Sequence, residues 1–497
     1  MIMMLRCVVR CWPLLLLMFC SSSANALQLE EKVQEHTLKN GLRLLMVERH
    51  DAPTVAAYIT LGVGSVDEGN ENRGVAHLLE HMLFKGTKQL GTVDYRREAP
   101  LLAEIEVTAE ALSAAKVQTP RNEEEVSRLA AKLSELQEQH RPLVVKDEFS
   151  RIYAENGGSG YNAFTSKDLT TYLIELPANK LELWAAIESD RMQNAVLREF
   201  YTERNVVMEE RRRSRETEPR GLLYEHLLAT AFTVHPYRAP IIGWMSDLEH
   251  LTLAETRNFL HRYYAPVNTV IALVGDFNPE DAITLVERYF GAIPTGEPVP
   301  KVTAVEPPQR GERRVNVVYD CEPQMLIAYR KAPLPDRDDY LFDLAAQILG
   351  EGRSSRLYRR LVEEEQLATS VATYGAPGSR YPNLFVISAI PRSPHNAAEV
   401  ETVIYEELAR LGNELVSDEE LEQARKQLRV GTLRQLRGNG GLARMLTYYQ
   451  TVAGDWRYVT RYNEAITSLS AEELQGLARR AFVPENRTVA TIGRSGE

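Results

Sequence analysis

The chain contains few cysteines, and most of them lie at its start. Of four cysteines in 497 residues, Cys7, Cys11 and Cys20 fall within the first 20 residues, which leaves Cys321 alone in the remainder. A single thiol cannot form an intrachain disulfide, so the fold has to be stabilised by a hydrophobic core. A disulfide-stapled scaffold is excluded.

The chain also has fewer basic than acidic residues. The 58 Lys and Arg residues are outnumbered by 69 Asp and Glu, which gives a net charge of −11. A nucleic-acid partner is therefore not expected, because phosphate backbones are bound by basic surfaces. An acidic cavity for basic or neutral peptides is compatible with this charge, and so is a plain solvated acidic surface. The apolar content of 44 % is ordinary for a globular protein. The length of 497 residues allows about three domains.

Long hydrophobic runs are missing except at the N-terminus. Arg6 and Arg10 precede an apolar run over residues 12–20, and Ala24-Asn25-Ala26 follows it. This order predicts a secretory signal peptide over residues 1–26, a periplasmic or secreted protein, and no integral membrane span after signal removal. A mitochondrial transit peptide is the alternative, because the first acidic residue is Glu30. Lipidation of Cys20 is a weaker alternative, because bulky residues precede it.

The segment with the clearest chemistry is His77-Leu-Leu-Glu80-His81. Apolar residues at positions 75, 78, 79, 82 and 83 have helical spacing, so a short buried helix is expected here. On that helix His77 and His81 lie one turn apart and can reach one metal ion, with Glu80 close by. Two imidazoles and a carboxylate that is not a ligand suit a hydrolytic zinc site, in the inverzincin order. Two core histidines on a buried helix are the alternative.

Other segments suggest the rest of such a site. Residues 200–211 predict a helix on which Glu203 and Glu210 share one face, so that either could supply a third metal ligand. A glycine-rich turn at residues 157–160 leads into a strand-like run, whose edge could bind an extended peptide. A purely structural hairpin would have the same sequence pattern.

The chain contains an internal duplication. Residues 251–275 align without gaps on residues 469–493, at an offset of 218, and share a helix-Pro-x-Asn-strand order. Near the front of each half, Pro53-Thr-Val-Ala-Ala-Tyr resembles the segment that begins at Pro323, at an offset near 270. The first half therefore carries about 52 additional residues between these points.

The additional residues correspond to a predicted helical hairpin, an insertion at about residues 97–150. It could be a docking arm, a lid or a tolerated insertion. A proline-rich linker is expected over residues 294–311, between an N-terminal domain of residues 27–293 and a C-terminal domain of residues 312–497. At the 270 offset Gln347, Gly350 and Glu351 replace the three motif residues, so no zinc ligands are expected in the second half.

These motifs together resemble the M16 metallopeptidases, the pitrilysin, insulysin and mitochondrial processing peptidase group. The resemblance covers nearly all of the chain after residue 26 and includes residues 74–87, Asn162-Ala-Phe-Thr-Ser, Glu203-Arg-Asn-Val-Val-Met-Glu-Glu210 and His235-Pro-Tyr. It implies an α+β fold of two homologous α/β repeats, each a mixed sheet covered by helices, which form half of a clamshell. The hairpin insertion would lie in the first repeat.

The resemblance also implies residue roles. The zinc ligands would be His77, His81 and Glu210, and the catalytic acidic residues would be Glu80, as general base, and Glu203, which supports the site. Asn162 and Ala163 match positions that contact the substrate backbone on an edge strand. The implied function is a zinc-dependent endopeptidase that cleaves unfolded peptides or small proteins, with Zn²⁺ as cofactor.

One departure from the family pattern bears on partners. Active clamshells have an Arg and a Tyr seven residues apart in the half opposite the zinc, but Val362 and Thr369 occupy those places. A valine cannot donate to an oxyanion, so we expect a dimer, preferably a heterodimer with a sister chain that lacks the zinc motif and keeps the Arg and Tyr. Arg359, Arg360 or Tyr374 could substitute. The alternative function is a non-catalytic structural or peptide-binding subunit.

Overall fold

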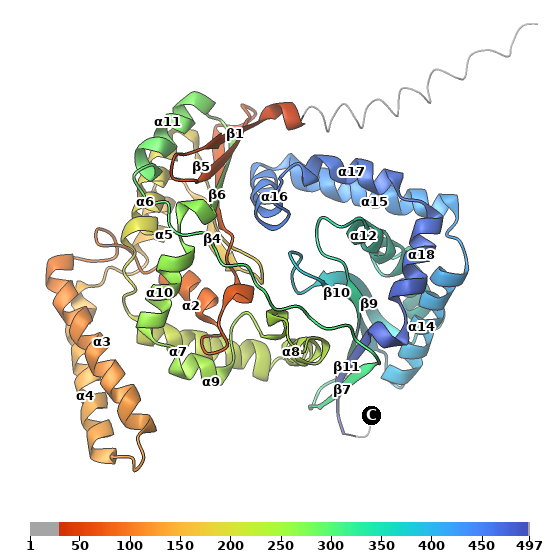
Figure 1. Cartoon of the computed structure of the whole chain (residues 1–497), viewed down its shortest axis with the longest axis horizontal. Helices are drawn as coiled ribbons and strands as arrows, with labels where there is room; N and C mark the ends of the chain where they lie inside the picture. Colours follow the sequence, from red (N-terminus) through yellow and green to blue (C-terminus); the bar gives the residue numbers. More distant parts are fainter. Residues whose placement is uncertain (1–28, 496–497) are drawn as a thin grey trace, which may run out of the picture.

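The computed structural model describes residues 29–495, and the predicted signal peptide lies outside this range. The described chain forms two lobes, each built around one β-sheet (Figure 1). The first sheet has the strand order β1-β2-β6-β3-β5-β4 and the second has the order β7-β11-β8-β10-β9. The strands of the first sheet are β1 Val33–Thr37, β2 Arg43–Glu48, β3 Thr54–Leu61, β4 Ser159–Thr165, β5 Thr170–Pro177 and β6 Thr269–Gly275. Those of the second are β7 Arg313–Val318, β8 Gln324–Lys331, β9 Ala368–Ala376, β10 Asn383–Pro391 and β11 Arg487–Gly493.

Helices cover both sheets. In the first half they are α2 Val75–Met82, α3 Tyr95–Val117, α4 Glu123–His140, α5 Glu148–Glu155, α6 Leu181–Asn194, α7 Phe200–Arg211, α8 Pro219–Ala231, α9 Met245–His250, α10 Leu253–Tyr263 and α11 Pro279–Phe290. In the second half they are α12 Arg337–Leu349, α13 Arg356–Tyr358, α14 Ala397–Asn413, α15 Asp418–Arg437, α16 Asn439–Val452, α17 Tyr458–Ser468 and α18 Ala471–Ala481. Every residue of β6 is buried, as expected for a central strand with helices on both faces.

Apart from β1, which has no counterpart in the second sheet, the two sheets share one topology. In the first sheet β2 runs parallel to β6, and in the second β7 runs parallel to β11, whereas all other neighbours in both sheets are antiparallel. The bounds of α10 and β6 match those of α18 and β11 at an offset of 218, and those of β3 match β8 at 270. The predicted α+β fold of two repeats is confirmed.

Each lobe covers one face of the other lobe's sheet. Helix α16, from the second half, packs Leu442, Ala443 and Leu446 against strands of the first sheet. Helix α8, from the first half, packs Leu223 and Leu227 against strands of the second sheet. Both helices lie between the lobes (Figure 1). The two hydrophobic cores therefore depend on each other.

The predicted helical hairpin is formed by α3 and α4, which project from the first lobe (Figure 1). The hairpin has a small core of its own, made by Leu112, Ala115, Val126 and Leu129. Asn122 precedes α4, and its side chain accepts the backbone N–H of Glu125 and so caps the helix. No helix within residues 29–495 is both long and apolar enough to cross a membrane.

Candidate metal centre

Helix α2 is held at its start by buried polar contacts. The Glu68 carboxylate accepts the backbone N–H groups of Gly74 (3.0 Å) and Ala76 (2.9 Å), which the first turn of a helix leaves without partners. Gly74 has a φ of +96°, and a Cβ there would lie 2.6 Å from the Ile242 carbonyl oxygen. Only glycine fits this position, so the orientation of the helix is closely constrained.

Three side chains from two helices converge next to α2. The imidazoles of His77 and His81 lie with ring centroids 4.7 Å apart, and Glu210 faces them from α7. Its carboxylate oxygens lie 3.8 Å from His77 Nε2 and 3.6 Å from His81 Nε2. One donor atom from each residue lies within 4.8 Å of the others, the only such group found in residues 29–495.

This donor set fits a zinc ion. The separations of 3.6 and 3.8 Å exceed a normal hydrogen bond. Ligand atoms on a tetrahedral zinc, at bond lengths of about 2.0–2.2 Å, are themselves about 3.4 Å apart. Two imidazole nitrogens and one carboxylate oxygen are a common donor set for catalytic zinc.

The surroundings shift the pKa values of the two histidines in opposite directions. Burial, helped by the charges of His81 and Arg215, lowers the pKa of His77 to about 3, so its imidazole is neutral and able to ligate. Burial opposes charge on His81 as well, but the hydrogen bond to Glu203 and the surrounding carboxylates raise its pKa. The surroundings of His81 therefore favour its charged form more than those of His77 do.

Glu80 lies beside this cluster and points toward strand β4. The Thr165 hydroxyl donates to Glu80 Oε2 at 2.6 Å. Burial raises the pKa of Glu80, which is only 9 % exposed, and the hydrogen bond from Thr165 partly offsets this effect. Glu80 and His81 line a cavity of about 560 Å³, together with Asn162 and Glu203. The arrangement leaves Glu80 free to exchange a proton with a molecule in this cavity.

Glu203 contacts one histidine from behind. Its Oε1 lies 3.0 Å from His81 Nδ1, and Lys85 Nζ lies 2.5 Å from its Oε2. Burial alone would raise the pKa of Glu203, but the hydrogen bonds with His81 and Lys85 lower it to about 2. As a carboxylate it holds the His81 proton on Nδ1, which leaves Nε2 free to ligate. It is a positioning residue rather than a member of the three-residue cluster.

The two predicted substrate-contact residues lie on a free sheet edge. Strand β4 is the last strand of the first sheet, and Asn162 and Ala163 pair with β5 on one side only. Asn162 is exposed and lines the cavity beside Glu80, whereas the Ala163 side chain is buried. Thr165, three residues further along β4, is about 10 Å away along an extended strand. The edge and the carboxylate are thus close together, although substrate contact by Asn162 and Ala163 stays a prediction.

The equivalent region of the second half holds no comparable cluster within the described residues. Gln347, on α12, donates to the Gln427 side chain and the Glu351 backbone. Val362 packs against the second core, and the Thr369 hydroxyl donates to the Ile390 carbonyl. Arg360 contacts the carboxylates of Glu365, Glu406 and Glu407, so its charge is already neutralised.

Sequence reasoning left three neighbours of the site without a role. Thr165 and Lys85 lie within motifs that it used, and Glu68 precedes the motif helix. Thr165 and Glu80 are 85 residues apart in the chain. No local spacing indicates such a contact. Glu68 lies six residues before Gly74, which is further from the helix start than a capping residue usually lies, so its contact was not predictable from spacing.

Comparisons with known proteins identify a family that matches this chain. The family described as Insulinase (Peptidase family M16) matches residues 43–115 and 144–244, and the family described as Peptidase M16 inactive domain matches residues 250–428. Together the matches cover more than half of the chain. The unmatched residues 116–143 lie in the hairpin.

Relatives of known name are similar over almost the whole chain. The zinc protease PqqE of Helicobacter pylori is 26 % identical over 96 % of both chains. The uncharacterized zinc protease YmxG of Bacillus subtilis is 24 % identical over 93 % of this chain and 99 % of its own.

Solved structures share the fold. A protease from Helicobacter pylori superposes with a TM-score of 0.78 at 25 % identity, over 93 % of this chain and 99 % of its own. The first half of the periplasmic protease PqqL of Escherichia coli gives a TM-score of 0.66 at 17 % identity, over 94 % of this chain and 92 % of its own. Against complete PqqL, this chain covers 47 % of the length.

Proposed function

This chain belongs to the insulinase family of peptidases, M16, and on that premise we propose that it is a zinc-dependent endopeptidase acting on unfolded peptides or small proteins. The observation that carries the proposal is the approach of His77, His81 and Glu210 to one another, with Glu80 beside them. A subunit that only bound peptides would not need a buried carboxylate next to two ligating histidines.

Each of these side chains would have a distinct part in peptide hydrolysis. A zinc ion held by His77, His81 and Glu210 would supply a Lewis acid that acidifies water and polarises the scissile carbonyl. The Glu80 carboxylate would take a proton from the attacking water and return it to the nitrogen of the leaving amine. Its raised pKa suits both steps, because such an acid accepts a proton more readily and still releases it.

The supporting residues would orient the reactants. Glu203 would keep His81 in the tautomer that presents Nε2 to the metal. The backbone of β4 at Asn162 and Ala163 would pair with an extended peptide as an additional strand. An unfolded segment can add to a sheet edge in this way, whereas a folded substrate cannot offer its backbone.

We further propose that the working enzyme is a dimer, preferably with a sister chain that lacks the zinc motif. This is supported by Val362 and Thr369, neither of which offers the cation and phenol expected opposite the zinc. The match to the first half of PqqL, and to only 47 % of its full length, is compatible with such pairing. The sister chain would supply the donors that stabilise the transition-state oxyanion.

The sequence also favours export. Residues 1–26 carry the signal-like pattern, and PqqL is named as periplasmic. We propose a periplasmic or secreted location. Cell fractionation with N-terminal sequencing of the purified protein would test it. A mature start near Leu27 in the exported fraction is expected.

The test of function is cleavage of a mixed library of unfolded peptides by the zinc-loaded protein, alone and with candidate sister chains. The control variant is Glu80→Gln, for which we expect a fall in kcat of about 10²–10⁴-fold at unchanged zinc content. Activity that requires a sister chain and disappears in Glu80→Gln would support the heterodimer. Full activity of the single chain would rule the heterodimer out.

The second candidate function is a non-catalytic subunit that binds peptides. The specific observation in its favour is the absence of an Arg and Tyr at positions 362 and 369, in a half that matches the M16 inactive domain. Bound zinc without turnover in the presence of any partner would favour this candidate over the peptidase.

A further inference from the structure

Helix α7 and the hairpin enclose a groove that the catalytic proposal does not use. The groove has a volume of about 990 Å³. The hairpin contributes Ala109, Leu112, Ser113, Lys116 and Leu133 to one wall. The opposite wall is α7, with Thr202, Val206, Glu209 and Glu210. The groove is therefore lined in part by a residue of the candidate metal centre, Glu210.

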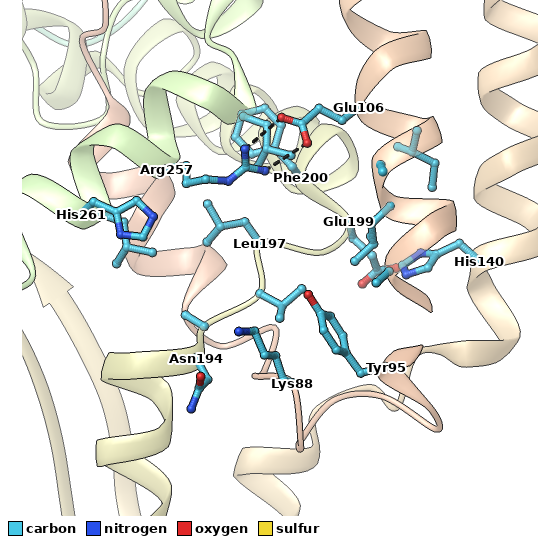
Figure 2. A pocket seen from close by; sticks show the side chains of 18 of the residues that line it. Lys88, Tyr95, Glu106, His140, Asn194, Leu197, Glu199, Phe200, Arg257 and His261 are labelled. Atoms are coloured by element: carbon cyan, nitrogen blue, oxygen red, sulfur yellow. Dashed lines mark hydrogen bonds and ion pairs between the residues drawn. The ribbon is translucent and has the colours of Figure 1, made fainter. Parts of the chain in front are cut away.

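Neighbouring hollows continue this groove in both directions. The cavity beside Glu80 also has Thr202 and Val206 in its lining, so the two hollows meet along α7. A third cavity, of about 910 Å³, lies between the base of the hairpin and α10 (Figure 2). It shares Gln137 and Tyr201 with the groove. Together they form a path that leads from the hairpin to the metal centre.

The hairpin wall is held firmly in place. At its base Arg198 donates to both carboxylate oxygens of Glu98, at 2.8 and 3.0 Å, and His140 Nε2 lies 2.8 Å from the same carboxylate. Higher up, Glu106 of α3 forms a two-bond ion pair with Arg257 of α10, drawn across the cavity in Figure 2. The width of the groove is thus set by fixed contacts rather than by a loose insertion.

The lining of the groove combines apolar surface with positive charge. Val206 is 48 % exposed there, although it is apolar. Lys116 and Arg204, both in the lining, have no ion pair with any residue of the described chain. Arg213 is matched by Glu209, at 3.2 Å. The Glu210 carboxylate is the remaining acidic group of the lining, so three basic side chains face two acidic ones and the groove carries a small basic excess in a chain whose net charge is negative.

We propose that this groove binds the substrate itself, as an extended segment of about four residues on one side of the scissile bond, with a preference for acidic and apolar side chains. Along α7, Glu210 and Tyr201 are nine residues or about 14 Å apart, a length that an extended peptide covers in about four residues. The inference rests on the proposed function, because the scissile bond is taken to lie at the metal centre. It makes the hairpin a determinant of substrate length and charge.

The experiment measures peptide binding, so that it does not depend on turnover. Fluorescently labelled peptides are titrated against full-length zinc-loaded protein with the Glu80→Gln substitution. Three peptides are compared. One is short, and the other two carry about four additional residues at either end. In the acidic extension leucine alternates with aspartate, and in the basic extension leucine alternates with lysine. Ser113→Trp fills the groove from an exposed position, and Ala114→Trp places the same ring on the next exposed residue, outside the lining.

We expect the acidic extension to tighten binding about tenfold, a gain of about 1.4 kcal/mol, and the basic extension to add little. Ser113→Trp and Lys116→Glu should abolish the gain for the acidic extension without changing the affinity for the short peptide. Ala114→Trp should keep the gain.

Two results would overturn the inference. One is equal affinity for all three peptides, and the other is equal behaviour of Ser113→Trp and Ala114→Trp. Loss of association with a second chain in Ser113→Trp, with unchanged peptide affinity, would also overturn it and would assign the groove to a subunit interface. If the extended peptide binds more tightly but the parent protein never cleaves peptides, the proposed peptide-binding role of the groove is supported and only the peptidase proposal fails.

Discussion

At the scale of single residues, the metal centre depends on which of two adjacent glutamates faces the histidines. Glu210 approaches both Nε2 atoms, whereas Glu209 forms ion pairs with Arg212 and Arg213 at the surface. We expect Glu210→Gln to weaken zinc binding by more than about 100-fold, since an amide is a poor metal ligand. Zinc retained after dialysis against a chelator measures this loss.

The matched control is Glu209→Gln. It changes the same charge one residue away and should bind zinc as the parent protein does. Equal zinc loss in both variants would show that net charge, rather than ligation by Glu210, determines affinity.

Glu203 acts on the metal through His81. Its carboxylate fixes the Nδ1–H tautomer, so we expect Glu203→Gln to lower zinc affinity by about 10–100-fold. Competition with a fluorescent zinc chelator measures the affinity. Glu199→Gln is the control, because the Glu199 carboxylate lies 3.7 Å from Lys85 Nζ and forms no ion pair with a histidine among the described residues. An unchanged affinity in Glu203→Gln would show that packing alone orients His81.

At the scale of elements, the hairpin is attached to the lobe through a buried carboxylate. Burial alone would raise the pKa of Glu98, but hydrogen bonds from His140 and Arg198 lower it to about 2. Glu98→Gln would leave the Arg198 charge buried without its partner, so we expect a loss of about 3–5 kcal/mol in the free energy of unfolding. Urea titration at neutral pH measures this difference.

The pH dependence of that difference is a second consequence. The folded pKa of Glu98 lies below its ordinary value of 4.5, so its contribution is complete above pH 4.5 and is lost as the pH falls from 4.5 toward 2. Parent and Glu98→Gln stabilities should therefore converge over this interval. Glu104→Gln, which removes an exposed ion pair with Lys132, should cost less than about 1 kcal/mol at any pH. A constant difference for Glu98→Gln would contradict the ion-pair explanation.

At the scale of the whole molecule, each half contributes one helix to the other half's core. Helix α8 covers the second sheet and α16 covers the first, so the two lobes form one folding unit. Leu446 on α16 and Leu227 on α8 are fully buried, each against the other half's sheet. We expect Leu446→Ala or Leu227→Ala to cost about 2–5 kcal/mol and to lower the midpoint of one shared calorimetric transition. Leu433→Ala, at a 43 % exposed position, is the control and should have little effect. Two separate calorimetric transitions, with each variant lowering the midpoint of only one of them, would show that the lobes unfold independently.

The fold class was within reach of sequence reasoning because a duplication repeats whole elements at constant spacing. The offsets of 218 and 270 reappear in the bounds of helices and strands, since each repeat encodes its own local structure. The hairpin could be located for the same reason, because the two offsets differ by the number of residues inserted in the first half. The exchange of α8 and α16 was not predictable, because each helix carries an apolar face that would suit either sheet.

The pair of histidines with Glu80 was predictable from the order of residues alone, because one helical turn brings i and i+4 together whatever surrounds them. Helix geometry alone left Glu203 and Glu210 equivalent, since residues seven apart share a helix face, and the family resemblance gave the ligand role to Glu210. The packing of α7 against α2 places Glu210 toward the Nε2 atoms and Glu203 toward Nδ1. The contact of Thr165 with Glu80 and the groove beneath the hairpin also arose only in the tertiary structure, because both join elements whose relative position no local pattern encodes.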